Sequence, residues 1–233
     1  MTEKVNGDTL LLRRKGWAEM KLFLYKLRRT PYVAISLVVL NALLFLLCTF
    51  TGDLLYNIGR ISPYTFLDKG KYYQLLTSMF LHADMSHLVN NMLLLAGLGY
   101  LMEKEIGHFL FFLLYVLTGI GAGAVSLAWK VHNGEWFVYS IGASGAVYGM
   151  LGVLLAMCLL RVRDMENVNW QKMLIMIAYS IYCGFEGSNI DNAAHIGGVI
   201  CGLLLGALAC LVLKLHDERK QRSRLRQMGV YGR

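Results

Sequence analysis

The chain has 233 residues, of which 56% are hydrophobic and only 16% are charged, and its mean hydropathy is +0.48. A water-soluble domain of this size does not need so much apolar surface, so these values exclude an ordinary soluble protein. The formal net charge of +8 does not indicate nucleic-acid binding, because in a membrane protein it more often reflects cytoplasmic loops and anionic lipid.

The first segment, residues 1–31, is polar and basic and has neither the apolar core nor the cleavage site of a signal peptide. Within it Trp17, Met20, Leu24 and Leu27 recur at helical spacing between lysines and arginines. This pattern predicts a short amphipathic helix on an anionic membrane surface. A disordered basic segment fits the same residues equally well.

Six apolar stretches follow, and they approach the roughly 20 residues that a helix needs to cross a bilayer. The predicted spans cover residues 33–50, 87–102, 109–129, 143–160, 173–185 and 193–213. The first two are separated by a long, aromatic-rich segment, 51–86, of the kind that is usually functional or interfacial. The sequence thus predicts an all-α membrane protein with a six-helix membrane domain at 32–213 and a basic tail at 214–233.

An even number of spans places both termini on the same side of the membrane. If that side is the cytoplasm, all but four of the 23 lysines and arginines are cytoplasmic. The four on the outer side are Arg60, Lys69, Lys71 and Lys130. Since lysine and arginine favour the cytoplasmic side, both termini are expected there.

Three polar residues inside the predicted spans fall in one layer. His87, Ser144 and His195 lie between 16 and 19 residues before the charged residue that closes their span. At 1.5 Å per residue, each is about 24–29 Å above the cytoplasmic charges, near the outer side. Ionisable groups inside spans are rare and usually mark function, so this layer is a candidate site.

Each polar residue also has an ordinary structural explanation. The stretch 142–145, Gly-Ala-Ser-Gly, fits a helix-packing seam, and His87 with Asn91 fits a hydrogen bond between helices. His195 fits a buried core histidine whose hydrogen bonds are satisfied by neighbouring groups. His82, just above the second span and outside the layer, is expected to brace the long loop.

A metal site is a second alternative, with His82, His87 and His195 as ligands. Only Asp84 and Asp191 accompany them as carboxylates, and no thiol does. Moreover, His82 and His87 are five residues apart, which suits one face of a helix poorly. A serine–histidine pair is favoured over a metal.

A pair of Ser144 and His195 makes chemical sense, because a serine hydroxyl becomes a good nucleophile only beside a base, and histidine is a base near neutral pH. The Ser144 amide, His87 and Asn91 are candidate donors to the oxyanion that would form. Gly198, Gly202 and Gly206 form a stripe that predicts close approach of the last span to the span carrying Ser144.

The combination of motifs resembles the rhomboid intramembrane serine proteases. The matching motifs are His82-x4-His87-x3-Asn91, Gly142-Ala143-Ser144-Gly145 and Ala194-His195-x2-Gly198-x3-Gly202, within about residues 72–209. The resemblance implies a six-helix rhomboid-like bundle. It further implies that Ser144 is the nucleophile and His195 the base, without a third triad member.

The same resemblance implies auxiliary roles. It places oxyanion groups at His87, Asn91 and the Ser144 amide, and a ring-stacking tyrosine at Tyr148. It makes Glu103 a structural glutamate, within Gly99-x3-Glu103-x3-Gly107. The chain departs from the family where an aromatic residue is usually followed by arginine, because here Tyr73 is followed by Gln74.

The implied function is that of an intramembrane serine endopeptidase, which cleaves a peptide bond in or beside the transmembrane helix of a membrane-protein substrate. No metal or other cofactor is expected, and the six-span form is typical of a multi-pass protein of the bacterial plasma membrane. The alternatives are a catalytically silent rhomboid-like protein that binds membrane helices and a small transporter. Ser144 and His195 argue against the first, and the lack of related halves argues against the second.

Overall fold

The structure is a computed structural model, and it describes residues 17, 19–21, 30–160, 168–186 and 190–227. The amphipathic helix predicted within segment 1–31 lies almost entirely outside these residues. The described part consists of helices and connecting loops, with an isolated pair of antiparallel backbone bonds between Ile61 and Ser140. The architecture is therefore all-α, as the sequence predicts.

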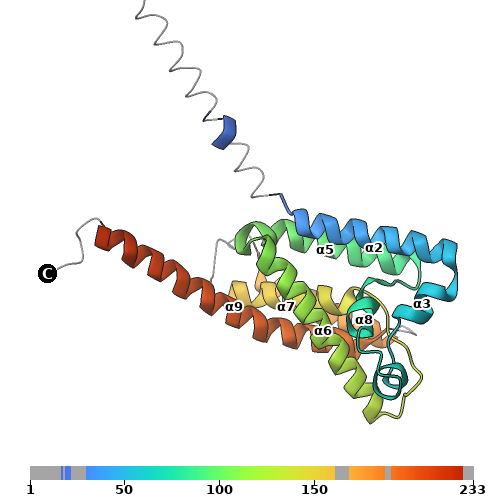
Figure 1. Cartoon of the computed structure of the whole chain (residues 1–233). Helices are drawn as coiled ribbons and strands as arrows, with labels where there is room; N and C mark the ends of the chain where they lie inside the picture. Colours follow the sequence, from blue (N-terminus) through green and yellow to red (C-terminus); the bar gives the residue numbers. More distant parts are fainter. Residues whose placement is uncertain (1–16, 18, 22–29, 161–167, 187–189, 228–233) are drawn as a thin grey trace, which may run out of the picture.

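The long helices of the described part coincide with the six predicted apolar stretches. They are α2 (Tyr32–Thr51), α5 (Met85–Ile106), α6 (His108–His132), α7 (Ser144–Leu159), α8 (Trp170–Glu186) and α9 (Asn192–Gln227). By length and composition, α2, α6 and α9 are apolar enough to cross a membrane, and α7 is a shorter apolar helix. Figure 1 shows α2 lying along α5, and α9 running the length of α7 and continuing beyond it.

The outward faces of these helices carry large apolar side chains that no other part of the described chain covers. Examples are Phe50, Leu93 and Leu204, which are 85%, 69% and 67% exposed. Soluble proteins rarely present such extended apolar surface to water. This outer surface is suited to lipid.

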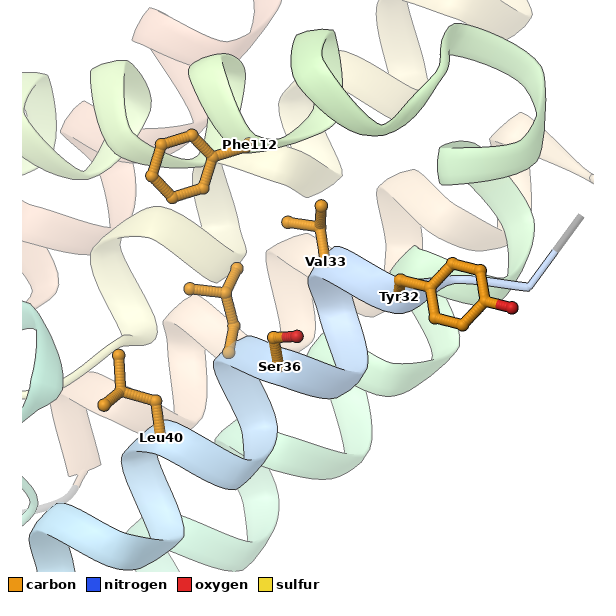
Figure 2. Close-up of a pocket in the computed structure, with 6 residues that line it drawn as sticks. Tyr32, Val33, Ser36, Leu40 and Phe112 are labelled. Carbon is orange, nitrogen blue, oxygen red and sulfur yellow. The ribbon is translucent and has the colours of Figure 1, made fainter. Parts of the chain in front are cut away.

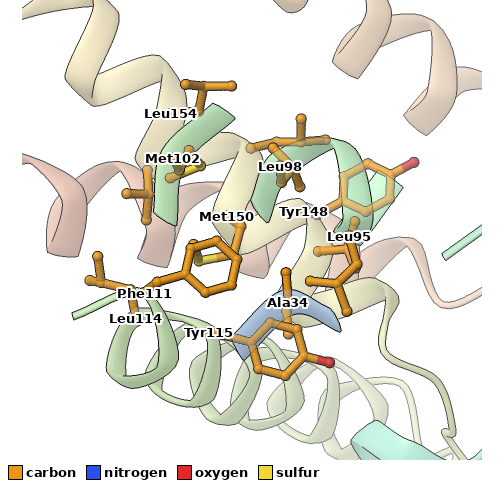
Figure 3. Packing of buried hydrophobic residues seen from close by; sticks show 14 of the residues in the cluster. Ala34, Leu95, Leu98, Met102, Phe111, Leu114, Tyr115, Tyr148, Met150 and Leu154 are labelled. Atoms are coloured by element: carbon orange, nitrogen blue, oxygen red, sulfur yellow. The ribbon is translucent and has the colours of Figure 1, made fainter. Parts of the chain in front are cut away.

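Helix α7 lies at the centre of the bundle. Every residue from Gly145 to Met157 is buried, because α6 and α9 pack along it and α5 and α8 also contact it. A helix that is apolar all round is stable only when it is surrounded, and α7 has no polar face that would need water. Figure 3 shows Tyr148, Met150 and Leu154 of α7 packed with Leu95, Leu98 and other residues of α5 and α6.

The contact between α7 and α9 is a seam of glycines. A side chain at Gly198 would meet the backbone of Gly145, and one at Gly202 would meet the carbonyl oxygen of Gly149. Further along, a Cβ atom at Gly206 would lie 2.8 Å from the Cα of Val153. The predicted close approach of these two helices is confirmed.

A second close approach joins the end of α5 to the start of α2. Gly99 packs against Ala34, where a side chain on Gly99 would collide with the Ala34 methyl group. The Glu103 carboxylate is fully buried and accepts hydrogen bonds from the Val33 and Ala34 amides at 2.8 and 2.9 Å. A carboxylate at a helix N-terminus stabilises unpaired amides, so Glu103 holds α2 in place.

The long segment 51–86 is not an irregular loop. It contains α3 (Asp53–Gly59), a π-helical turn (Tyr64–Asp68), α4 (Gln74–Thr77) and a 3-10 turn (Ser78–Phe80). Gln74 is fully buried, and its Nε2 donates to the Ile58 carbonyl at 2.8 Å. The residue that replaces the usual arginine therefore faces inward and joins α4 to the end of α3.

We expect Gly202→Ala to destabilise the protein, because the new Cβ atom would meet the Gly149 carbonyl and force α7 and α9 apart. Overpacking of this kind costs about 1–3 kcal/mol. The unfolding midpoint in detergent should fall. Gly97→Ala is the matched control: no atom lies within 4 Å of its added Cβ, and alanine favours a helix over glycine by up to about 1 kcal/mol. Equal midpoints for the two variants would contradict the tight seam.

Candidate active site

The three polar residues of the predicted layer all lie in the first turn of a helix. His87 is in the first turn of α5, Ser144 begins α7, and His195 is in the first turn of α9. Ser144 and His87 are partly exposed, whereas His195 is buried. The fold brings these three helix starts together through two sets of contacts.

The first contact joins His87 to the chain just before Ser144. Gly142 has a φ of +126°, and a Cβ atom there would lie 2.7 Å from both Cε1 and Nε2 of the His87 ring. Only glycine therefore fits at this position, because other residues rarely adopt this φ and a side chain would collide with the His87 ring. The Gly142 amide donates to the Ser78 carbonyl at 2.9 Å, which fixes the approach to Ser144.

The second contact joins α9 to the start of α7. A Cβ atom at Gly145 would lie 3.8 Å from the Cβ and the carbonyl oxygen of Ala194. The His195 ring stacks on Tyr148, with centroids 4.1 Å apart and planes at 7°. The Tyr148 hydroxyl is itself hydrogen-bonded to the Ser180 hydroxyl on α8. His195 is thus held against Tyr148, which lies one helical turn after Ser144 on α7.

Among the described residues, the Ser144 hydroxyl makes no hydrogen bond to His195, and the buried His195 Nδ1 has no partner. Hydrogen bonds between a nucleophile and its base are often long without substrate and shorten in the complex. No carboxylate in the described part of the chain orients the ring from behind, so its orientation depends on the stack with Tyr148.

The three helix starts differ in how they are capped. Asp84 accepts from the His87 amide at 2.8 Å, and Asp191 accepts from the Ala194 amide at 3.0 Å. The bonds from the His87 amide and the Ser86 hydroxyl lower the pKa of Asp84. Helix α7 instead follows Ala143, which gives no side-chain cap. The first-turn amides of α7, at the positive end of the helix, are therefore left for an anion.

Asn91 and His82 surround His87. The Asn91 side-chain nitrogen donates one hydrogen bond, to the His87 carbonyl at 2.9 Å. A side-chain amide has two N–H hydrogens, so the second is available to another acceptor. His82 is fully buried, with its ring 5.0 Å from that of His87 in an edge arrangement. The Tyr56 hydroxyl donates to the His82 carbonyl at 2.6 Å, so His82 also ties α3 to the chain just before α5.

Other candidate sites are separate from this one. No three metal-ligating His, Cys, Asp or Glu side chains gather anywhere in the described ranges. An open apolar groove of about 300 Å³ lies between α2 and α6 (Figure 2) and is lined by Tyr32, Val33, Ser36, Leu37, Leu40 and Phe112. Val33, which lines this groove, contacts Glu103 near the end of α5, whereas His87 lies at the start of that helix. The groove is therefore at the opposite end of α5 from the candidate site.

Comparison with known proteins gives a consistent result. A family model described as the Rhomboid domain matches residues 69–212. The rhomboid protease GluP of Bacillus subtilis is 34% identical over 139 residues, which cover 60% of this chain and 26% of that protein. RHOMBOID-like protein 5 of Arabidopsis thaliana is 31% identical over 147 residues, covering 62% of this chain and 46% of that protein.

The putative rhomboid protease YdcA of Bacillus subtilis is 30% identical over 160 residues, which cover 69% of this chain and 73% of that protein. The chain thus spans most of YdcA but only about a quarter of GluP and under half of RHOMBOID-like protein 5. The model match begins before α4 and extends into α9, so it contains His87, Ser144 and His195.

The resemblance drawn from the sequence motifs is therefore confirmed, since the family model covers more than half of the chain. The apolar helices and the lipid-suited outer surface agree with a protein embedded in a membrane. The chain belongs to the rhomboid family and is an integral membrane protein.

Proposed function

We propose that this protein is an intramembrane serine endopeptidase with Ser144 as nucleophile and His195 as general base. The observation that carries the proposal is the uncapped start of α7, where the His87 ring of α5 lies against Gly142 and the His195 ring of α9 stacks on Tyr148. The names of the relatives GluP and YdcA, which call them rhomboid proteases, support it.

In the proposed reaction, His195 accepts the proton of the Ser144 hydroxyl while the oxygen attacks the carbonyl carbon of the scissile peptide. The oxyanion then accepts hydrogen bonds from the Ser144 amide, from His87 and from the free hydrogen of the Asn91 amide. His195 donates its proton to the departing amine, and the C–N bond breaks. Water, deprotonated by His195, hydrolyses the resulting ester and restores Ser144.

Tyr148 takes on the task that an aspartate performs in a triad, which is to orient the imidazole. The Tyr148 ring stacks on the His195 ring with centroids 4.1 Å apart and so fixes the plane of the imidazole. The hydrogen bond to the Ser180 hydroxyl in turn holds the Tyr148 side chain in place. This arrangement supports a Ser144–His195 dyad with Tyr148, His87 and Asn91 as auxiliary residues.

The topology belongs to the same proposal. The six long helices span the membrane with both termini in the cytoplasm, and the three helix starts of the site lie toward the outer face. The distribution of lysine and arginine supports this orientation. The proposed substrates are membrane proteins cleaved in or beside a transmembrane helix, and the proposed location is a bacterial plasma membrane.

Ser144→Ala and His195→Ala should each abolish cleavage of a transmembrane substrate, with turnover lower by about 10⁴-fold or more. They should also prevent labelling of Ser144 by a fluorophosphonate, which needs an activated serine. His132→Ala, which changes an exposed histidine at the end of α6, is the control. Labelling of a monodisperse His195→Ala protein at the parent rate would rule out the dyad and favour a binding protein without activity.

Asn91→Ala should lower turnover by about 10²–10³-fold, less than Ser144→Ala, because one oxyanion donor among several is lost. The neighbouring Asn90 is exposed on the same helix, so Asn90→Ala should leave turnover at the parent value. Steady-state kinetics on one helical substrate compare the two. Equal rates for both variants would remove Asn91 from the proposed site.

A further inference from the structure

A largely buried ion pair, with side chains 6% exposed at Lys130 and 21% exposed at Asp191, joins the last turn of α6 to the residue before α9. The Lys130 ammonium lies 3.1 Å from the Asp191 Oδ2 atom. The hydroxyls of Ser126 and Ser140 each donate to the same carboxylate oxygen at 2.5 Å. Lys130 also contacts the Ser140 hydroxyl. We call these four residues the Lys130–Asp191 cluster.

The mechanism above uses none of these groups, and their burial calls for an explanation. Removing two charges from water costs free energy that their attraction only partly returns, so a buried ion pair is a poor source of stability. In some proteins such pairs are retained because they select one arrangement of the elements that they join. The relevant question is which arrangement the Lys130–Asp191 cluster selects.

The cluster connects the two chain segments that lead to the proposed dyad. Ser140 is four residues before Ser144, and Asp191 is four residues before His195. Ser140 is also paired through its backbone with Ile61, at 2.7 and 3.2 Å. One carboxylate therefore ties the approach to the nucleophile to the approach to the base.

Asp191 also sets the start of α9. Its second carboxylate oxygen caps the Ala194 amide at 3.0 Å, and its carbonyl accepts from the His195 amide at 3.2 Å. Both oxygens are thus occupied, and the unpartnered His195 Nδ1 does not contact them. Asp191 is not a third triad member, and any effect it has on His195 acts through the backbone.

The carboxylate is charged under ordinary conditions. Burial by itself would raise the pKa of Asp191. The Lys130 ammonium and the hydrogen bonds from Ser126 and Ser140 more than offset this effect, so the pKa of Asp191 is below its ordinary value. The Lys130–Asp191 contact is therefore a true ion pair near neutral pH.

We propose that the Lys130–Asp191 cluster sets the position of Ser144 relative to His195, and that Lys130 and Asp191 are positioning residues for hydrolysis. The inference rests on the function proposed above. Glycines let α7 and α9 touch but present a smooth surface, and no hydrogen bond joins Ser144 to His195 in the described structure. A further contact that fixes the relative position of the two helix starts is then important, because a misplacement of a catalytic group by about 1 Å costs about 10²-fold in rate.

The test compares Asp191→Asn, Lys130→Met and the double variant with the parent in detergent. Each single variant leaves a buried polar partner unpaired and should unfold at a lower temperature. The double variant removes both charges, so its unfolding midpoint should return toward that of the parent. Its kcat and its rate of fluorophosphonate labelling should nevertheless remain about 10²-fold lower, with KM nearly unchanged. Asp68→Asn, at the exposed last residue of the π-helical turn, is the control.

A double variant that regains both stability and the parent labelling rate would show that the cluster only stabilises the fold, and would overturn the proposal. If charge removal prevents folding, Ser140→Ala gives the answer, because it deletes one hydroxyl and leaves the ion pair. It should lower the labelling rate in a protein that remains folded, with a smaller drop in the unfolding midpoint than either charge variant shows, and a parent labelling rate would again overturn the proposal.

The parent protein separates this inference from the proposed function. Labelling of the parent that is lost in Ser144→Ala supports the serine nucleophile independently of the cluster. If the parent is not labelled, the proposed function fails and the positioning role fails with it. If the parent is labelled and the variants match its rate, only the positioning role fails.

Discussion

The backbone contact between α7 and α9 is the constraint on which the rest of the bundle depends. In lipid there is little hydrophobic gain from bringing two apolar helices together, so their association depends on close van der Waals packing. Gly198 and Gly202 permit that packing because they add no side chain between the backbones. The contact places α7 inside the bundle. It also places the starts of the two helices together, which brings the proposed nucleophile and base to one point.

The carboxylates that complete helix starts are divided between two ends of the bundle. At one end Glu103 accepts from two amides of α2 and lies 2.5 Å from His108, so it completes a helix start. At the other end Asp84 and Asp191 complete the starts of α5 and α9 in the same way. Helix α7 alone among these four starts has no carboxylate cap. The missing cap is a local cost in stability, and it falls at the residue that the proposed chemistry needs.

Much of this arrangement was predictable from the sequence, because it follows from helical spacing and chain direction. The apolar stretches, the glycine seam and the gathering of His87, Ser144 and His195 are of this kind. The Lys130–Asp191 cluster was not predictable, since Lys130 and Asp191 are 61 residues apart in the sequence. Lys130 also follows directly after a predicted span that ends at residue 129, so it was expected in a solvent-exposed loop. In fact α6 continues to His132 and buries that lysine. The short helices of segment 51–86 depend likewise on distant contacts, such as that of Gln74 with Ile58.

Helix α9 is unbroken over 36 residues, which corresponds to about 54 Å at 1.5 Å per residue. The hydrocarbon core of a bilayer is only about 30 Å thick, so the helix is far longer than a crossing requires. Its final turns carry exposed cations, among them Arg219, Lys220 and Arg222. The same continuous helix therefore carries the His195 imidazole, stacked on Tyr148, in its first turn and exposed cations in its last turns.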